Sequence, residues 1–394
     1  MLGHPERHFA AVHVGGTNGK GSTATLLAEV LGAGGWRVGL YTSPHLVSFR
    51  ERVLVDGAPI AEDAVTNWTA RLEAEAVRLG ASFFEIGTAV AFADFAARGV
   101  DVAVVEVGLG GRLDATNVLL PLACGVTRIA LEHTEYLGPD RESIAREKAG
   151  IGKPGVAFAT TEPDGGIAAV LLEEARRRGA VAEWLDPAAC LSHVSAGRDG
   201  VRFRARTPMR TYDQLEIGLR GPYQAENALL ALRLAELMAP AFPVGEPALR
   251  AGLRRARVPG RFDQRGRWLF DVAHNPDGMR ALVAALAAAA PPRPIAAVVA
   301  VLRDKAWREM LDVLAGGVDR LILTAAPSAP AERAWRLDEA AAWARERGLE
   351  AVAEPAFDAA LGRAAGEAAT VLVTGSFHTV GDAMCRLPGT PPLG

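Results

Sequence analysis

Short apolar runs alternate with amphipathic stretches along the first two-thirds of the chain. The apolar runs are rich in Val and Ala and too short for long helices, and they cover residues 10–14, 36–41, 101–107 and 124–130. Helical periodicity covers residues 22–31, 61–79, 84–97, 141–150 and 222–238, whereas 180–217 is irregular and strand-rich without a clear helix. This alternation is typical of a mostly parallel sheet flanked by helices.

A second alternating series follows the segment Arg-Val-Pro-Gly at 257–260, where Pro and Gly break regular structure. Its expected strands are 268–272, 295–301, 320–323 and 370–374, with helices at 277–289, 307–314, 337–347 and 357–365 and a closing helix. The pattern predicts two α/β domains, residues 1–257 with a mostly parallel sheet and residues 258–394 forming a smaller Rossmann-like domain.

Composition excludes several classes of protein. The 394 residues are 49% hydrophobic and 23% charged, the balance of a globular protein. No apolar run reaches membrane-spanning length, and the N-terminus lacks the basic and apolar regions of a secretory signal. The three cysteines lie far apart and fit neither a disulfide framework nor a metal knuckle. A net charge of −3 gives no reason to expect nucleic acid. We expect a cytoplasmic protein with no membrane or nucleic-acid partner.

Lysine is scarce and therefore informative. Only four of the 43 basic residues are Lys, at positions 20, 148, 153 and 305, and the rest are Arg. A GC-rich genome would explain the replacement of Lys by Arg at positions where only a positive charge is needed. The remaining lysines are therefore mildly enriched for positions where Arg would not serve.

A glycine-rich loop, Val14-Gly-Gly-Thr-Asn-Gly-Lys-Gly-Ser22, lies between the first expected strand and helix. Backbone N–H groups of such a loop and the helix N-terminus can surround phosphates, with Lys20 reaching the β- and γ-phosphates. It departs from the usual P-loop, because Val14 replaces the first Gly and Gly21 separates Lys20 from Ser22. A tight strand–helix turn is the alternative, and the scarcity of Lys favours ATP binding.

Other polar residues follow the expected strands at the same sheet edge. Glu106 ends a buried strand beside the loop strand, where a magnesium ligand is expected. Ser43 and His133 lie in loops after two further apolar runs, and Lys148 lies on a short helix after the His133 loop. Taken singly, three of these residues have a structural alternative: Glu106 as a residue that merely ends a strand, His133 as a structural histidine and Lys148 as a solvated helix residue. Convergence on one edge favours a site.

Taken in order, ten segments resemble the folylpolyglutamate synthase/dihydrofolate synthase family of Mur-ligase-like ATP-dependent amide ligases. They are GTNGKGS, TSPHLVSFRERV, FFEIGT, EVGLGGRLDATN, LEHTEYLGPDRESIAREKAGI, AENALLAL, PGRFD, FDVAHNP, LRDKA and TGSFHTV. The resemblance implies a P-loop ATPase domain followed by the Rossmann-like domain. Glu132, Glu135 and Tyr136 stand where the family usually has Asp, Asp and Trp, which are conservative differences.

The resemblance also implies roles for individual residues. ATP would be bound by Thr17, Asn18, Gly19, Lys20, Gly21, Ser22, Asn227, Arg261 and Asp271. Two Mg²⁺ sites would use Ser43, Glu106 and His133. The folate or pteroate pocket would be lined by Ser82, Phe83, Phe84, Glu85, Leu113, Asp114 and Ala115, and the incoming glutamate would lie near Ser376 and His378. Lys20, Lys148 and His274 would be catalytic, with Lys148 carbamylated.

The implied reaction is addition of L-glutamate to dihydropteroate or a reduced folate through an acyl phosphate, by a monomer whose two domains close to exclude water. A Mur-type ligase acting on another carboxylate is the alternative, although the chain has no room for a separate domain that binds a nucleotide-linked substrate. A nucleotide-binding regulator would need neither the second domain nor Lys148.

The N-terminus differs from the family pattern. The family usually has a longer segment before the phosphate loop, including a helix that helps to hold the pterin, but only fourteen residues precede Gly15 here. Two interpretations follow: the true start lies further upstream, or the pterin is held with less enclosure.

Overall fold

The computed structural model describes residues 2–389, and within them the chain forms two compact units. The main division falls between Arg257 and Val258. Two short segments, Ser195–Val201 and Leu219–Tyr223, cluster with the second unit although they precede this division. The prediction of one division, between residues 257 and 258, does not place these two segments with the second unit.

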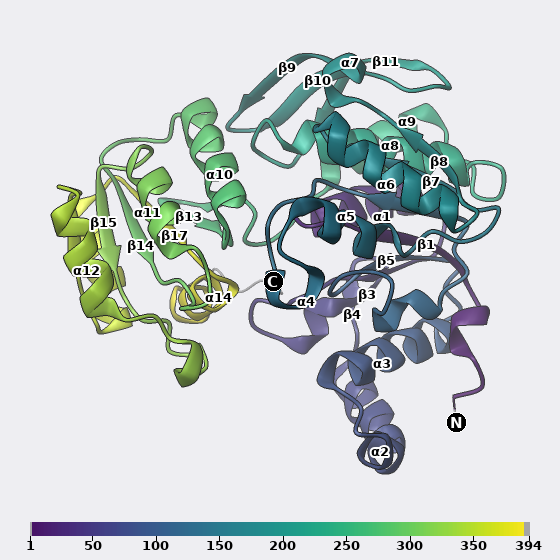
Figure 1. The fold of residues 1–394 in the computed structure, drawn as a ribbon, viewed down its shortest axis with the longest axis horizontal. Helices are drawn as coiled ribbons and strands as arrows, with labels where there is room; N and C mark the ends of the chain where they lie inside the picture. Colours follow the sequence, from purple (N-terminus) through teal and green to yellow (C-terminus); the bar gives the residue numbers. More distant parts are fainter. Residues whose placement is uncertain (1, 390–394) are drawn as a thin grey trace. The chain divides into compact units, whose positions relative to one another are not determined.

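The first unit, coloured mainly from purple to teal in Figure 1, is built on an eight-stranded sheet with the order β4-β3-β2-β5-β1-β6-β7-β8. The strands are β1 (Ala10–Gly15), β2 (Val38–Tyr41), β3 (Val53–Val55), β4 (Ala58–Pro59), β5 (Val102–Glu106), β6 (Ala123–Val126), β7 (Ala157–Thr160) and β8 (Val181–Trp184). Pairing is parallel from β2 to β8, and only β3 and β4 run antiparallel to their neighbours. The predicted mostly parallel sheet is confirmed.

Helices cover both faces of this sheet. One face packs against α3 (Phe83–Ala97), α5 (Arg141–Ala149) and α6 (Gly165–Arg177). The other packs against α1 (Lys20–Ala33) and α8 (Gln224–Met238), with α9 (Glu246–Arg255) lying on α1. The remaining helices of the unit are α2 (Glu62–Leu79), α4 (Thr134–Leu137), α7 (Pro187–Cys190) and the 3₁₀ turns η1 (Pro5–Arg7), η2 (Phe49–Arg52) and η3 (Ala115–Val118). Burial on both faces explains why β1 and β5 are almost continuously apolar.

The irregular region predicted at 180–217 contains a separate three-stranded sheet. Its order is β11-β10-β9, and its strands are β9 (Leu191–Gly197), β10 (Gly200–Arg206) and β11 (Thr211–Ile217). In β10, exposed Arg residues alternate with buried apolar ones, the pattern of a sheet with one solvated face. The four-residue helix α7, next to this sheet, was not predicted.

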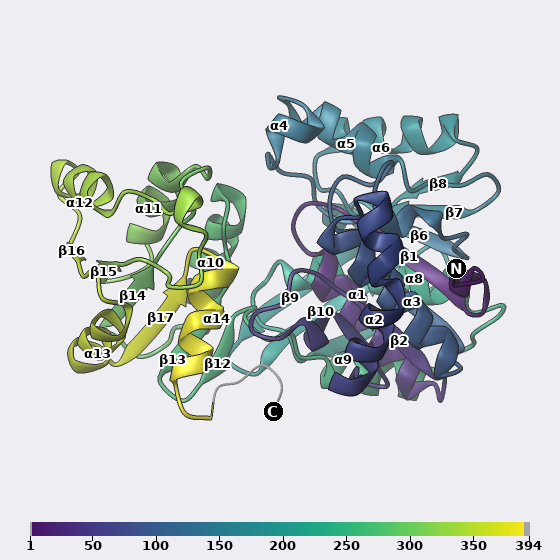
Figure 2. The same ribbon diagram turned by 90° about the horizontal axis from the view of Figure 1, so that it is seen from below.

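The second unit contains a six-stranded sheet with the order β12-β13-β17-β14-β15-β16. Its strands are β12 (Asp263–Arg265), β13 (Trp268–Asp271), β14 (Ile295–Val299), β15 (Arg320–Leu323), β16 (Ala351–Ala353) and β17 (Thr370–Thr374), all parallel except β12. Figure 2 shows its helices, α10 (Pro276–Ala289), α11 (Trp307–Ala315), α12 (Leu337–Glu346), α13 (Phe357–Glu367) and α14 (Phe377–Arg386), with η4 (Ala331–Arg333) as a short turn. The Rossmann-like α/β expectation is confirmed.

The predicted strand at 124–130 is too long, because β6 ends at Val126. The Thr127 N–H still bonds to Gly15 O, but the Ile129 N–H donates to the Glu162 carboxylate instead of a neighbouring strand. The apolar residues that suggested a strand are buried for another reason: Ile129 packs in the core formed with α5 and α6. His133 therefore follows a loop and not a strand end.

Candidate active site

The glycine-rich loop joins β1 to α1 in the first unit. Two of its glycines have backbone conformations that side chains rarely adopt, Gly16 with φ 133° and Gly19 with φ 101°. A Cβ on Gly16 would lie 1.9 Å from Thr127 Oγ1, and one on Gly19 would lie 2.2 Å from Asn227 Oδ1. The loop therefore requires glycine at both positions, for conformation and for space.

The N-terminus of α1 is suited to an anion. Its N-cap is Gly19, so no N-cap side chain occupies the first N–H groups of the helix. Lys20 is half-buried at the start of the helix, and its amine donates to Thr17 O at 3.0 Å. Uncapped N–H groups, the helix dipole and this amine favour negative charge at one place.

Helix α8 packs against the loop and contributes amide side chains. Asn227 Nδ2 donates to Gln224 Oε1 at 2.8 Å, and Gln224 Nε2 donates to Ser22 Oγ at 3.3 Å. Asn227, Gln224 and Ser22 are all buried, so the predicted residues Ser22 and Asn227 are joined through Gln224. Gln224 was missed by the sequence analysis, although its place at the start of α8, three residues before Asn227, was the available signal.

Glu106 lies directly beside the loop. It ends β5, pairs in register with Val14 of β1, and is only 3% exposed. Its Oε2 accepts the Ser43 N–H at 3.0 Å and lies 3.4 Å from where a Cβ on Gly21 would stand. The structure thus brings together Ser43, Glu106 and the start of α1, as the sheet-edge argument predicts.

Lys148 is buried on α5, 5% exposed, and its Nζ donates to Gly16 O at 2.7 Å. Burial, followed by the positive charge of Lys20, lowers the pKa of Lys148 to about 7, while Glu132, Asp114 and Glu106 oppose that shift. The alternative of a solvated helix residue is therefore wrong. The amine is close to the loop and has a substantial neutral fraction near pH 7.

His133 is the N-cap residue of α4 and has a left-handed backbone, φ 53°, which is uncommon for a residue with a side chain. Its Nε2 lies 3.7 Å from Glu132 Oε1. In the described residues, no group of three or more His, Cys, Asp or Glu side chains could hold a metal ion. Any metal at this edge would therefore also need ligands of other kinds, such as a hydroxyl or a phosphate.

The two segments predicted to line a folate pocket lie together. The Phe84 ring fills the space over Gly108, where a Cβ would stand 2.3 Å from it, and the next residue, Leu109, donates its N–H to Asp114 Oδ2 at 2.8 Å. Phe83 is 61% exposed, with the Arg52 guanidinium 5.3 Å from its ring centroid. Leu113 is also exposed, so both segments present apolar surface.

Two predicted pocket residues have a local structural role. Ser82 and Glu85 form a capping box at the start of α3, in which Glu85 Oε2 accepts both the N–H and the hydroxyl of Ser82 at 2.7 Å. These bonds lower the pKa of Glu85. The helix start alone explains these two side chains.

A buried histidine supports the Asp114 segment and was missed by the sequence analysis. His13, in the middle of β1, is fully buried and bonds through Nε2 to Thr116 Oγ1 at 2.8 Å, and Thr116 in turn donates to Asp114. Burial, then the charge of Lys153, lowers the pKa of His13 to about 3, so the ring is neutral. A polar residue within an otherwise apolar buried strand was the signal that could have found it.

In the second unit, three predicted residues lie together at the carboxyl edge of the sheet. Asp271 ends β13, and its two oxygens accept the N–H groups of Phe262 and Ala273 at 2.8 and 2.9 Å. Burial raises the pKa of Asp271, and the charge of Arg261 opposes this. The Arg261 guanidinium and the His274 ring both lie beside Phe377, 5.3 and 5.7 Å from its centroid.

Ser376 and His378 lie at the start of α14. Ser376 is the N-cap and accepts the Thr379 N–H at 3.1 Å. His378 Nδ1 is 3.0 Å from Ser328 Oγ, and burial lowers the pKa of His378. Both residues are at the sheet edge, but their visible contacts are within their own unit.

Two family models match the chain. The Mur ligase middle domain matches residues 14–235, and the Mur ligase glutamate ligase domain matches residues 254–377. No helix in the described part of the chain has the length and hydropathy needed to cross a membrane.

Proteins named as folylpolyglutamate or dihydrofolate synthases match almost the whole chain. Dihydrofolate synthase/folylpolyglutamate synthase of Escherichia coli is 38% identical over 94% of this chain and 85% of its own. The structure of Mycobacterium tuberculosis folylpolyglutamate synthase complexed with ADP superposes with a TM-score of 0.91 at 32% identity, covering 99% of this chain and 93% of that one. A bifunctional folylpolyglutamate synthase/dihydrofolate synthase with Mn, AMPPNP and L-glutamate bound gives 0.82 at 34% identity, covering 98% and 90%.

These matches disfavour the alternative of a Mur-type ligase for a different carboxylate, because the similarity extends over nearly the full length of the synthases. The loop, Glu106 and the buried Lys148 are consistent with the same conclusion. The chain belongs to the folylpolyglutamate synthase/dihydrofolate synthase family of Mur-type ligases.

Proposed function

We propose that the protein is an ATP-dependent ligase that joins the amino group of L-glutamate to the carboxylate of dihydropteroate or a reduced folate. The observation that carries the proposal is the buried Lys148 amine, 2.7 Å from Gly16 O of a glycine-rich loop that also adjoins Glu106. A nucleotide switch needs the loop but has no use for a buried lysine beside it.

A carboxylate is a poor electrophile at neutral pH, so it needs activation before an amide can form. Attack of the substrate carboxylate on the γ-phosphorus of ATP gives an acyl phosphate and ADP. Lys20 and the uncapped N–H groups of α1 stabilise the charge that collects on the phosphoryl oxygens. The glutamate amine then attacks the acyl carbon, and phosphate leaves.

The residues at the sheet edge fit magnesium, which prefers oxygen ligands. Glu106 supplies a carboxylate and Ser43 a hydroxyl, and we assign both to one Mg²⁺, with Glu106 and His133 serving a second. When bound, the ions neutralise charge on the phosphates and polarise the transferred group. Glu106 is held by the Ser43 N–H, so its carboxylate needs little reorganisation to bind a cation.

We assign Lys148 as a carbamylated lysine. Carbamylation requires the neutral amine, and a pKa near 7 supplies it at physiological pH. The carbamate would convert a buried cation next to Lys20 into an anion, which removes the like-charge repulsion between the two amines. Arg at this position could not react in this way.

For the substrates, we assign the surface formed by Phe83, Phe84 and the Leu113–Ala115 segment to the pterin and benzoyl part of the pteroate. In the second unit, we assign Arg261 and Asp271 to the nucleotide, and His274, Ser376 and His378 to the incoming glutamate.

A product assay tests the function directly. Dihydropteroate and tetrahydrofolate are offered separately with ATP, Mg²⁺ and labelled glutamate, and phosphate release is measured in parallel. We expect phosphate release that depends on both the pteroate or folate and the glutamate, with label in the product. ATP hydrolysis that is independent of glutamate would contradict the ligase assignment.

A further inference from the structure

An ion pair outside the predicted site holds the backbone segment that supports the phosphate loop. The pair is Glu162, which follows β7, and Arg141, at the start of α5, joined at 2.9 Å. Glu162 is fully buried, whereas the Arg141 side chain is 34% exposed. Neither residue belongs to the sites described above.

The pair hydrogen-bonds to both backbone polar groups of one residue, Ile129. Glu162 Oε2 accepts the Ile129 N–H at 2.6 Å, and Arg141 Nε donates to Ile129 O at 3.2 Å. The second Glu162 oxygen also accepts the Asp164 N–H at 3.0 Å. Burial raises the pKa of Glu162, while the two N–H donors and Arg141 favour its ionised form.

The neighbours of Ile129 bind the phosphate loop directly. Arg128 O accepts the N–H groups of Thr17 and Asn18, at 2.9 and 3.3 Å, and Ala130 O accepts the Thr17 hydroxyl at 3.3 Å. Thr17 O in turn accepts the Lys20 amine. A continuous path of hydrogen bonds therefore runs from the Glu162–Arg141 pair through residues 128–130 to Lys20.

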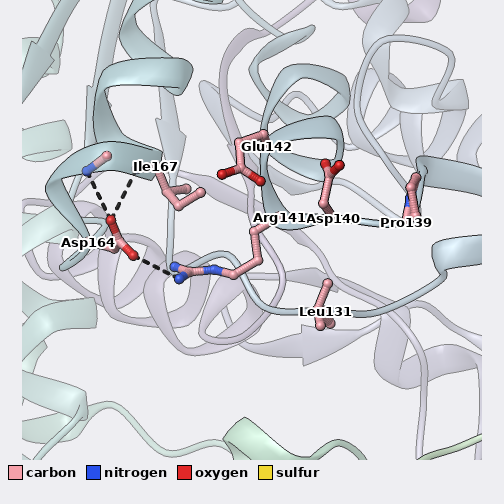
Figure 3. Close-up of a pocket in the computed structure, with 8 residues that line it drawn as sticks. Leu131, Pro139, Asp140, Arg141, Glu142, Asp164 and Ile167 are labelled. Carbon is pink, nitrogen blue, oxygen red and sulfur yellow. Dashed lines mark hydrogen bonds and ion pairs between the residues drawn. The ribbon is translucent and has the colours of Figure 1, made fainter.

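A cavity lies next to this pair and is lined in part by Arg141. It measures about 300 Å³ and is lined by Leu131, Pro139, Asp140, Arg141, Glu142, Asp164, Gly166 and Ile167. Figure 3 shows the Arg141 guanidinium turned toward Asp164, which caps α6. Each of the three guanidinium nitrogens donates to the protein, to Asp164, Glu162 and Ile129 O, so contacts within the protein account for the position of Arg141.

We propose that Glu162 and Arg141 are positioning residues for nucleotide binding, acting through Ile129 to hold Thr17, Asn18 and Lys20 in the phosphate-binding arrangement. The proposal rests on the function proposed above, because it assumes that the loop binds ATP. Without the pair, the Ile129 amide and carbonyl lose their partners inside the protein, and the 128–130 segment must find others by moving. The loop would then have to be reordered by the nucleotide, which weakens binding.

The test measures MgADP affinity by titration calorimetry for the wild type, Glu162→Gln and Arg141→Gln. Glu162→Gln keeps the size but removes the charge that pairs with Arg141, and Arg141→Gln changes a partly exposed side chain, so it is expected to fold. We expect the Kd for MgADP to rise about tenfold in both, as does the KM for ATP. The KM for glutamate is expected to change less than twofold.

Glu174→Gln is the matched control. Glu174 is also a poorly exposed carboxylate, 5% exposed, but its arginine partners, Arg177 and Arg178, belong to the same stretch of chain around the end of α6. It should lose stability without losing MgADP affinity. If Glu162→Gln and Arg141→Gln bind MgADP within twofold of the wild type, the positioning role is wrong. A wild type that binds no MgADP would instead overturn the proposed function.

Discussion

The two sheets place polar residues at their carboxyl edges in different ways. In the first unit, the edge residues contact one another across separate elements: Lys148 bonds to the glycine-rich loop, Glu106 to the Ser43 loop, and Asn227 reaches Ser22 through Gln224. In the second unit, Asp271 and Ser376 accept backbone N–H groups, and the side chains of Arg261 and His274 meet around the Phe377 ring.

This difference separates residues whose burial and position are explained by local structure from residues whose burial and position suggest a ligand. The buried Lys148 amine beside the glycine-rich loop carries a positive charge for which the local structure gives no reason. An N-cap serine is explained by its helix alone. The first unit is therefore the stronger candidate for the phosphoryl-transfer chemistry, and the second needs variants that separate capping from binding.

Lys20→Ala should have the largest effect on turnover. A variant without any effect would contradict the assignment of phosphoryl transfer to the first unit. Lys20 supplies charge at the start of α1 and is not a core residue, so we expect turnover to fall about 100-fold or more with little change in fold. Steady-state rates and circular dichroism check this. Lys153→Ala is the control, since Lys153 also donates to a backbone carbonyl, Asn117 O at 2.8 Å, away from the loop. Near-normal turnover of Lys20→Ala would remove the phosphate-loop assignment.

Lys148→Arg should follow, with a loss of roughly 10- to 100-fold, because Arg keeps the positive charge but cannot carry a carbamate. Lys148→Ala should regain part of its activity with a short carboxylic acid, and intact mass should show the carbamate on the wild type when bicarbonate is present. Arg146→Lys on the exposed side of α5 serves as the control. Wild-type turnover of Lys148→Arg would show that the buried amine has only a structural role.

Ser376→Ala tests whether a residue of the second unit binds substrate as well as capping its helix. Loss of the N-cap of α14 should lower the free energy of unfolding by about 1 kcal/mol. We also expect the KM for glutamate to rise several-fold, and Ser376→Thr to recover both properties because it keeps the hydroxyl. Urea unfolding and steady-state kinetics measure them. Should stability fall while the KM stays constant, Ser376 is a helix cap and nothing more.

His13 gives the smallest effect on activity and a distinct pH dependence. Its pKa is about 3 in the folded protein and near 6.5 in a model peptide, so between these values the unfolded chain binds the extra proton. The contribution of His13 to stability is therefore complete above about pH 6.5 and decreases by roughly 1 kcal/mol per pH unit as pH falls toward 3. His13→Gln, which can still donate to Thr116, should lose this slope in urea unfolding between pH 5 and 7. An unchanged slope would contradict a buried neutral histidine.

The sequence predicted the two larger sheets well because helices cover both of their faces, which makes strands such as β14 apolar throughout and β5 apolar up to Glu106. It also identified Glu106 and the glycine-rich loop, whose chemistry is local to a strand end. Gln224 and His13 were missed although each had a local signal, the position of Gln224 three residues before Asn227 and the polar His13 within an apolar strand. Glu162 had no such signal, because its partners Ile129 and Arg141 lie 33 and 21 positions earlier in the chain. The sequence analysis placed residues 127–130 in a strand because burial of Ile129 looks the same whether its N–H bonds to a strand or to a carboxylate.

The shape of the glycine-rich loop depends on segments synthesised long after it. Asn227, which fills the space next to Gly19, is 208 positions further along the chain than Gly19, and Glu162 is 143 positions further than Gly19. We therefore expect a nascent chain that has not yet extended through α8 to contain the loop sequence without the Asn227 side chain that packs against Gly19. Because a ligand stabilises only the state that binds it, we expect ATP to stabilise the first unit only after α8 has packed against the loop. Nucleotide binding during synthesis would instead report that this unit has been completed.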